Sequence, residues 1–239
     1  MSSAPLIATD GLGKSFGTEP ILRQIDLSVG AGRALLIHGR NGAGKSTLLG
    51  LLAGLLRPTA GVALLFGEAA YRLEPAKRRQ LGLLTHQSFL YANLTARENL
   101  EFFARLYDIS RPRPLIADWL ARVGLAAAAN ELVRSLSRGM EQRLAWARLM
   151  LPDPQILLID EPFTALDAEG VELAVALLNR ALARGAAVVL TAHQATAPAG
   201  LAPDFRELHR GRLIAPDTRP HARALVVDPA GARVSFGAA

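Results

Sequence analysis

The most informative stretch of this 239-residue chain is rich in glycine: Gly39-Arg40-Asn41-Gly42-Ala43-Gly44-Lys45-Ser46. It matches the pattern G-x-x-x-x-G-K-[ST] of a phosphate-binding loop. A short apolar run at 34–37 precedes it, and an apolar helical run at 46–55 follows it. Glycines in such a loop let backbone N–H groups point at a phosphate where the helix begins. The stretch therefore predicts a nucleotide site on an α/β fold.

The side chains at the end of this loop have separate predicted roles. Lys45 is expected to reach the β- and γ-phosphates as a point charge, which a planar guanidinium does poorly. Ser46 is expected to offer its hydroxyl to Mg²⁺. The alternative, a glycine-rich turn without a ligand, is disfavoured because both the motif and its context are present. The expected nucleotide-binding residues are Gly39, Arg40, Asn41, Gly42, Ala43, Gly44, Lys45, Ser46 and Thr47.

A second motif is an apolar strand at 156–159 that ends in two acids, Asp160 and Glu161. Open α/β folds bind their ligands at the carboxyl edge of the sheet, where this strand places Asp160. We expect Asp160 to hold Mg²⁺ and Glu161 to polarise a water in line with the γ-phosphate. Two acids after a strand can also be a solvated strand end, but the loop at 39–46 favours an active site.

Composition narrows the classes of function. The absence of cysteine excludes disulfides, zinc–thiolate sites, iron–sulfur clusters and a cysteine nucleophile. No signal peptide is evident, and no apolar run approaches the roughly 18 residues that span a bilayer. The net charge of +6 indicates a solvated basic surface, or affinity for nucleic acid, anionic lipid or a phosphate ligand. Only Lys14, Lys45 and Lys77 among the 27 cations are lysine, so a specific role is expected for lysine here.

Apolar runs and helical runs alternate along most of the chain, which is typical of an α/β domain. Alternation at 25–29 predicts a half-buried strand, and 186–191 reads as a buried one. Strand patterns are missing from about 88 to 151, where a capping box at 95–98 and a helical run at 115–123 predict an inserted helical subdomain. We expect a main domain over 1–215. The short tail over 216–239 could form a hairpin about 228–231.

Five further motifs lie along the chain in the order typical of one family. With them the sequence resembles the ATP-binding-cassette (ABC) ATPases over about residues 6 to 214. They are the A-loop aromatic Phe16, the Q-loop Gln87, the signature motif at 136–140, the D-loop at 164–167 and the switch His193. The resemblance implies an α/β P-loop NTPase fold. That fold combines a RecA-like core with an antiparallel β subdomain and an inserted α-helical subdomain.

The resemblance also implies a role for each motif residue. Phe16 would stack on adenine, and Gln87 would complete the shell of Mg²⁺ or water. His193 would donate a hydrogen bond to the γ-phosphate, which together with Glu161 argues for a hydrolysing site. A core phenylalanine, a loop glutamine and a core histidine are the structural alternatives for Phe16, Gln87 and His193.

The signature motif departs from LSGGQ at Arg138 and Met140, so residue 140 lacks the glutamine amide with which the family would contact the partner's nucleotide. Ser137 and Gly139 keep the family's residue types. They would begin a helix whose N–H groups act on the nucleotide of a second subunit. A local serine cap is the alternative for Ser137.

The resemblance implies an ATPase that uses ATP and Mg²⁺ and energises a transporter. It would pair with a second ATP-binding subunit, expected to be another copy, and dock on a transmembrane permease at the cytoplasmic face of the inner membrane. No nucleic acid is expected. A soluble ABC protein acting on ribosomes or DNA is disfavoured, since the interval from Ser46 to Ser137 is too short for a long coiled coil. A non-hydrolysing regulatory module is disfavoured by Glu161 and His193.

Within transport, the stretch 83–100 resembles exporter-type ATPases. It is similar to the ATPase of the haem exporter used in cytochrome c maturation. A multidrug, lipid or polysaccharide exporter is the alternative.

Overall fold

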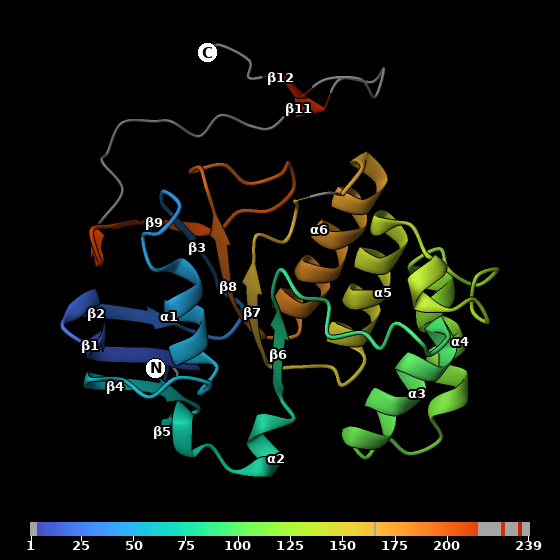
Figure 1. Cartoon of the computed structure of the whole chain (residues 1–239), viewed down its shortest axis with the longest axis horizontal. Helices are drawn as coiled ribbons and strands as arrows, with labels where there is room; N and C mark the ends of the chain where they lie inside the picture. The colour runs from blue at the N-terminus through green and yellow to red at the C-terminus, as the bar shows by residue number, and fades with distance from the viewer. Residues whose placement is uncertain (1–3, 165, 215–225, 228–233, 236–239) are drawn as a thin grey trace.

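The computed structural model describes residues 4–164, 166–214, 226–227 and 234–235 (Figure 1). The strands are β1 (Ile7–Phe16), β2 (Glu19–Val29), β3 (Ala34–His38), β4 (Ala60–Leu65), β5 (Glu68–Ala69), β6 (Leu81–Leu84), β7 (Ile156–Asp160), β8 (Ala187–Ala192), β9 (Asp204–His209), β10 (Arg212–Ile214), β11 (Val226–Val227) and β12 (Val234–Ser235). The helices are α1 (Lys45–Leu52), α2 (Pro75–Arg78), α3 (Ala96–Leu106), α4 (Pro112–Arg122), α5 (Arg138–Met150) and α6 (Ala168–Ala183), with 3₁₀ turns η1 (Ala70–Arg72) and η2 (Val133–Ser135).

The central sheet has the strand order β10-β9-β3-β8-β7-β6, and β9, β3, β8, β7 and β6 run parallel. Its middle strands β3, β7 and β8 are apolar up to their carboxyl ends because both of their faces are covered. The register pairs His38 of β3 with Ala192 of β8, and Asp160 of β7 with Thr191 of β8. The three segments that follow these strands therefore leave the sheet side by side, at its carboxyl edge.

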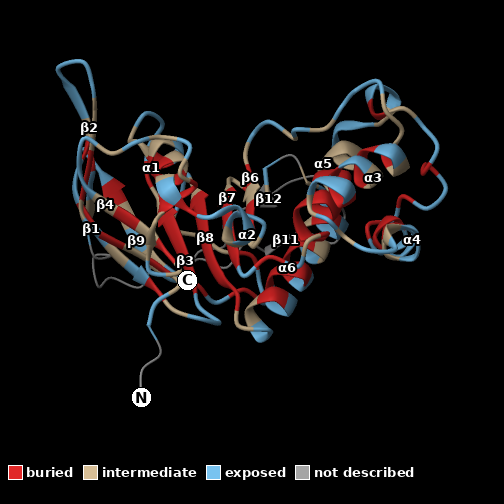
Figure 2. Ribbon diagram, turned by 90° about the horizontal axis from the view of Figure 1, so that it is seen from below, coloured by how far each residue is buried: buried red, intermediate tan, exposed pale blue. Residues whose placement is uncertain are grey.

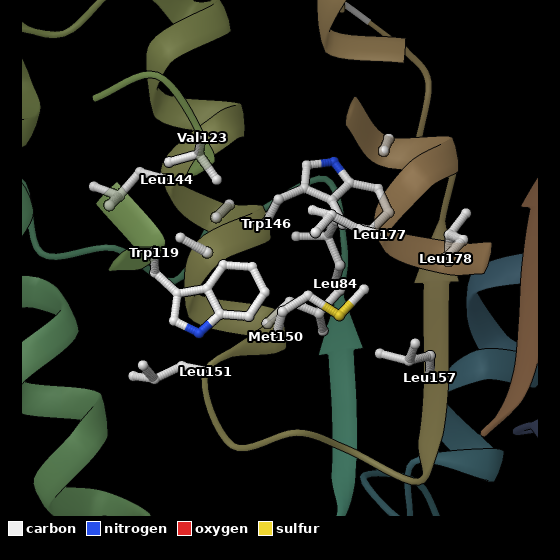
Figure 3. Packing of buried hydrophobic residues seen from close by; sticks show 14 of the residues in the cluster. Leu84, Trp119, Val123, Leu144, Trp146, Met150, Leu151, Leu157, Leu177 and Leu178 are labelled. Carbon is white, nitrogen blue, oxygen red and sulfur yellow. The ribbon is translucent and has the colours of Figure 1, made fainter. Parts of the chain in front are cut away.

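Two apolar clusters cover the two faces of this sheet. Ile156 and Leu158 face the antiparallel sheet β2-β1-β4-β5 and α1, while Leu157 and Ile159 face the helices. Figure 2 shows α1 and the antiparallel sheet on one side of the central strands and α3, α4 and α5 on the other. On the helical side Trp146 of α5 lies toward Leu177 of α6 (Figure 3). Burying each such large side chain contributes roughly 1.5–3 kcal/mol.

The expected architecture is confirmed: an α/β core, an antiparallel sheet and a helical insert between β6 and β7. Thr95 caps α3 by accepting from the Glu98 N–H, and Glu98 accepts from the Thr95 N–H, which completes the capping box. The helix expected at 115–123 begins three residues earlier, at Pro112, because Arg111 turns the chain with a φ of 52° and proline suits a first helical position. The helix expected at 46–55 ends at Leu52, because Gly54 with a φ of 69° does not continue it.

At the C-terminus, Val226–Val227 pairs antiparallel with Val234–Ser235. The turn expected at 228–231 lies outside the described residues, as does Ala165 of the D-loop.

Candidate nucleotide-binding and catalytic site

The phosphate loop runs from the end of β3 to the start of α1, and glycine is required where it bends or packs closely. Gly44 has a φ of 102°, a conformation that a side chain would strain. A Cβ at Gly39 would lie 2.5 Å from the carbonyl oxygen of Leu208. The Lys45 ammonium is 6% exposed and donates to the Gly39 carbonyl at 2.7 Å. The charge of Lys45 is therefore already held inside the loop.

Oxygen ligands meet beside this lysine. Ser46 Oγ donates to Asp160 Oδ2 at 2.8 Å, and Thr191 Oγ1 donates to Asp160 Oδ1. A hydroxyl and a carboxylate are ligands that Mg²⁺ accepts in sites where it also meets phosphate oxygens. Ser46 and Asp160 thus fit the metal predicted from the sequence, and Thr191 orients the carboxylate from the neighbouring strand.

Glu161 lies one residue beyond the sheet and takes an unusual backbone conformation, with a φ of 50°. Its N–H donates to Thr191 Oγ1 at 3.2 Å. Its carboxylate Oε1 lies 2.9 Å from His193 Nε2 and 4.0 Å from Lys45 Nζ. Strained backbone is commonly found at functional sites because the surrounding contacts over-determine it. The carboxylate of Glu161 therefore stands between the phosphate-loop lysine and the histidine that follows β8.

A pocket of about 360 Å³ joins the phosphate loop to the end of β1. It is lined by Phe16, Ile21, Asn41, Gly42, Gly44, Lys45, Ser46, Thr47 and Glu161. The ring of Phe16 is 51% exposed, so it is not a core phenylalanine. The lining therefore combines an aromatic ring with residues of the phosphate loop and its lysine, as a nucleotide requires.

The other predicted residues lie away from this pocket. Gln87 follows β6 and is exposed; its backbone N–H bonds to Thr85 Oγ1 at 3.2 Å. Ser137 caps α5 by accepting the Met140 N–H at 3.2 Å. A Cβ at Gly139 would meet no described heavy atom within 4 Å. The structure thus brings together Phe16, the loop, Asp160, Glu161 and His193, and leaves Gln87 and the signature residues apart from them.

A cleft of about 450 Å³ lies between the signature helix and the acidic end of β7. Ser46, Asp160 and Glu161 line one side of it, and Arg138, Glu141 and Gln142 of α5 line the other. Glu141 accepts a 2.6 Å hydrogen bond from Ser88 Oγ, which ties the Q-loop to the signature helix across this cleft.

An ion cluster between α5 and α6 carries no signal in the sequence motifs. The guanidinium of Arg143 donates to both carboxylate oxygens of Asp167 and to Glu169, each at 3.2 Å. The Gly170 N–H and Arg143 lower the pKa of Asp167. Burial lowers the pKa of Arg143, but the carboxylates of Asp167 and Glu169 have the larger combined effect, so the pKa of Arg143 is raised. This cluster fixes the signature helix to the end of the D-loop.

A family model described as "ABC transporter" matches residues 22–164. The chain belongs to the ABC transporter family. It is 41% identical over 196 residues to the cytochrome c biogenesis ATP-binding export protein CcmA of Xanthomonas campestris, covering 82% of this chain and 90% of that protein. It is 36% identical to CcmA of Haemophilus influenzae, covering 74% of this chain and 84% of that protein.

Two solved structures share the fold at 27% identity. An ATP-binding subunit of an ABC transporter superposes with a TM-score of 0.79, covering 87% of this chain and 88% of the other. A dimeric post-hydrolysis state of the ATP-binding cassette MJ0796, bound to ADP and Pi, superposes with a TM-score of 0.77 and covers 87% and 96%.

Family membership makes this chain an ABC ATPase, the subunit that hydrolyses ATP for an exporter. ATP-binding subunits of this family dimerise and act with a permease. Among the described residues, no helix is both long enough and apolar enough to cross a membrane.

Proposed function

We propose that this ATPase drives haem export for cytochrome c maturation, through a separate transmembrane permease at the cytoplasmic face of the inner membrane. The observation that carries the proposal is the 41% identity to CcmA of Xanthomonas campestris over 90% of that protein. This similarity extends well beyond the phosphate loop and the acidic strand end, which ABC ATPases of many substrates share.

Deletion of the coding sequence in its own organism tests the proposal. The deletion strain should lose haem-staining c-type cytochromes, and the wild-type sequence should restore them. Glu161→Gln serves as the inactive control for the restoring copy. Normal c-type cytochromes in the deletion strain would refute haem export.

A second candidate is export of an antibiotic or other amphipathic compound. The chain is 33% identical to the bacitracin transport ATP-binding protein BcrA of Bacillus licheniformis, covering 87% of this chain and 68% of that protein. The same deletion strain separates the two: bacitracin sensitivity with normal c-type cytochromes would favour this candidate.

In the proposed mechanism, the triphosphate lies on the loop at 39–46 and adenine stacks on Phe16. Ser46, Asp160 and, by resemblance to the family, Gln87 would hold Mg²⁺, which would offset the negative charge of the phosphate oxygens. Glu161 orients the attacking water and accepts its proton. The 2.9 Å contact between Glu161 and His193 supports a role for the histidine beside the γ-phosphate.

We assign Ser137 and Gly139 to the nucleotide of a second copy of the chain. Within one chain they do not line the pocket of Lys45 and Phe16. The start of the thirteen-residue helix α5 carries a partial positive charge that suits a γ-phosphate. The open space around Gly139 supports close approach by another molecule.

A groove of about 380 Å³ between α2, α3 and α5 is the proposed docking surface for the permease. Its rim holds exposed apolar side chains, among them Leu55, Phe89 and Leu106. At its floor Arg148 is 5% exposed; one Nη donates to the Leu83 carbonyl, but its buried Nε has no partner among the described residues. The described lining includes Arg78 and Arg79 but no acidic residue.

A buried cation without a carboxylate is costly, and burial lowers the pKa of Arg148. A permease segment with apolar side chains and one carboxylate would cover the exposed rim and compensate this charge. These observations support a partner at this groove whose docking segment is apolar and acidic.

A further inference from the structure

The lysine at position 14 lies directly behind the proposed adenine platform. Its ammonium is 5.0 Å from the centroid of the Phe16 ring. The two residues are two apart near the end of β1, where Phe16 pairs with Glu19 of β2. A cation at this distance from an aromatic face is attracted by the ring's quadrupole. One face of the half-exposed ring is therefore taken by the ammonium.

The same ammonium is anchored at its other side. Lys14 Nζ donates to the Arg57 carbonyl at 2.8 Å. Nearby, the Ser15 N–H donates to Thr59 Oγ1 at 2.7 Å, and the Thr59 N–H donates to the Gly13 carbonyl at 2.9 Å. The end of β1 is thus bound to the segment that follows α1, the helix that begins at the phosphate loop. These contacts fix the chain immediately before Phe16 relative to the segment at 57–59.

The residue type fits this geometry. Of the 27 basic residues, 24 are arginine and three are lysine. An ammonium is compact, so it can lie over a ring face while it donates to a single carbonyl. A guanidinium also stacks on aromatic rings, but it spreads its charge and donors over a plane instead of directing one compact charge at the ring and the carbonyl together.

We propose that Lys14 is a positioning residue for the nucleobase: its ammonium holds the Phe16 ring from one face so that the purine of ATP stacks on the other. This inference rests on the proposed role of Phe16 as the adenine platform. A ring held in one orientation loses less conformational freedom when the base binds, which favours affinity. The triphosphate, bound by the loop at 39–46, does not depend on this contact.

The test compares binding of ATP with binding of inorganic tripolyphosphate, which has the phosphates without the base. Lys14→Met should raise the Kd for ATP roughly two- to fivefold, the range of an exposed cation–π contact. The Kd for tripolyphosphate should not change, and KM should rise while kcat stays constant. Lys77→Met is the matched control, because Lys77 pairs with Glu68 and lies outside the nucleotide pocket.

Two further variants separate the contacts of Lys14. Lys14→Gln keeps a donor for the Arg57 carbonyl but removes the charge, so it should bind ATP as weakly as Lys14→Met. Wild-type affinity in Lys14→Gln would overturn the role of the cation. Lys14→Arg keeps a cation over the ring and should recover part of the affinity. A loss of tripolyphosphate binding equal to the loss of ATP binding would also overturn the inference, because the charge would then act on phosphate.

A double-mutant cycle with Phe16→Ala distinguishes this inference from the proposal beneath it. With the ring gone, Lys14→Met should have no further effect on the Kd for ATP; an additive loss would contradict the inference. Unchanged ATP affinity in Phe16→Ala would instead refute the platform itself. Weaker ATP binding in Phe16→Ala with wild-type binding in Lys14→Met would refute only the role of Lys14. Thermal melting of each variant confirms that the fold is kept.

Discussion

Glu161 Oε1 and His193 Nε2 lie 2.9 Å apart, although the two residues follow different strands, β7 and β8. The parallel pairing of β7 with β8 brings the two side chains to one edge of the sheet. The histidine is half-exposed, while the Glu161 side chain is 29% exposed and faces Lys45 as well. Glu161, His193 and the lysine of the phosphate loop are therefore already close together in a single chain.

Glu161→Gln should stop turnover and keep ATP binding. The amide is similar in size to the carboxylate but cannot accept the proton of the attacking water, so kcat should fall roughly 10²- to 10⁴-fold. ATP should then remain between two subunits, and the variant should elute as a dimer from a sizing column only with Mg-ATP. Hydrolysis near the wild-type rate would show that Glu161 is not the proton acceptor.

Lys45→Ala should weaken ATP binding by roughly 100-fold, because a charge-assisted contact to phosphate is lost. Lys45→Arg should fail as well, since the planar guanidinium cannot take the buried position in which the ammonium bonds the Gly39 carbonyl. Titration calorimetry measures both. Melting temperatures near that of the wild type exclude unfolding as the cause, and unchanged affinity in Lys45→Ala would place the nucleotide elsewhere.

The strands and turns beside the candidate nucleotide site were predicted from the sequence more accurately than the rest of the fold. β3 and β7 are short apolar runs followed by motif residues, so pattern and motif agree. β1 contains Gly11, Gly13 and several polar residues, and pairing with both β2 and β4 determines its conformation. Such a strand is stabilised by tertiary contacts, which leave no clear alternation in the sequence.

Buried polar residues were also beyond prediction from sequence. Arginine is rarely buried, so nothing in the spacing of α5 distinguishes Arg148 on the groove floor from an exposed residue of the same helix. The same applies to Arg143, whose two carboxylate partners come from the start of α6. The signature motif marked where α5 begins, but the contacts of its later turns depend on how the helices pack.

Asn99 provides a stability prediction. It is fully buried; its Oδ1 accepts the Tyr91 N–H at 2.8 Å, and its Nδ2 donates to the carbonyls of Tyr91, Leu94 and Thr95. Asn99→Ala removes these hydrogen bonds and leaves the Tyr91 N–H without a partner among the described residues, while the three carbonyls keep their backbone donors. The substitution should lower the free energy of unfolding by about 3 kcal/mol. Urea unfolding measures the loss. A change below about 0.5 kcal/mol would mean that water replaces the amide.

Leu106→Glu tests the proposed docking groove. Leu106 is 58% exposed on the groove rim, so the fold and the ATPase of the free subunit should tolerate the change. Binding to the permease should fail, because a charge replaces apolar contact. Co-purification from detergent-solubilised membranes of the native organism, with a tag on this chain, gives the readout.

Ile214→Glu is the matched control for this experiment. Ile214 is also an exposed large apolar residue, at 43%, but it lies on β10 outside the groove. It should retain the permease. Retention by both variants would contradict docking at the groove, and loss by both would show that the charge alone disturbs the complex.

Ser137→Arg tests whether the signature acts on the other subunit. Ser137 and Gly139 do not line the pocket of Lys45, so ATP binding to the monomer should stay almost intact. The bulky cation should block approach to the partner's γ-phosphate, and closure of the dimer and hydrolysis should fail together. Weaker ATP binding by the isolated monomer would instead mean that Ser137, which caps α5, acts only within its own chain.

Mixing two inactive variants decides between action within one chain and action between chains. In a heterodimer of Lys45→Ala with Ser137→Arg, both lesions fall in one site if the signature acts on the partner, and the other site is whole. Some ATPase activity should therefore return on mixing, at most half of the wild-type rate per dimer when the sites turn over independently. If the signature acted within its own chain, each site would carry one lesion and the mixture would stay inactive. Co-purification through a tag on one variant shows that heterodimers have formed. If these heterodimers hydrolyse no ATP, each mixed dimer does not contain one intact site that works independently.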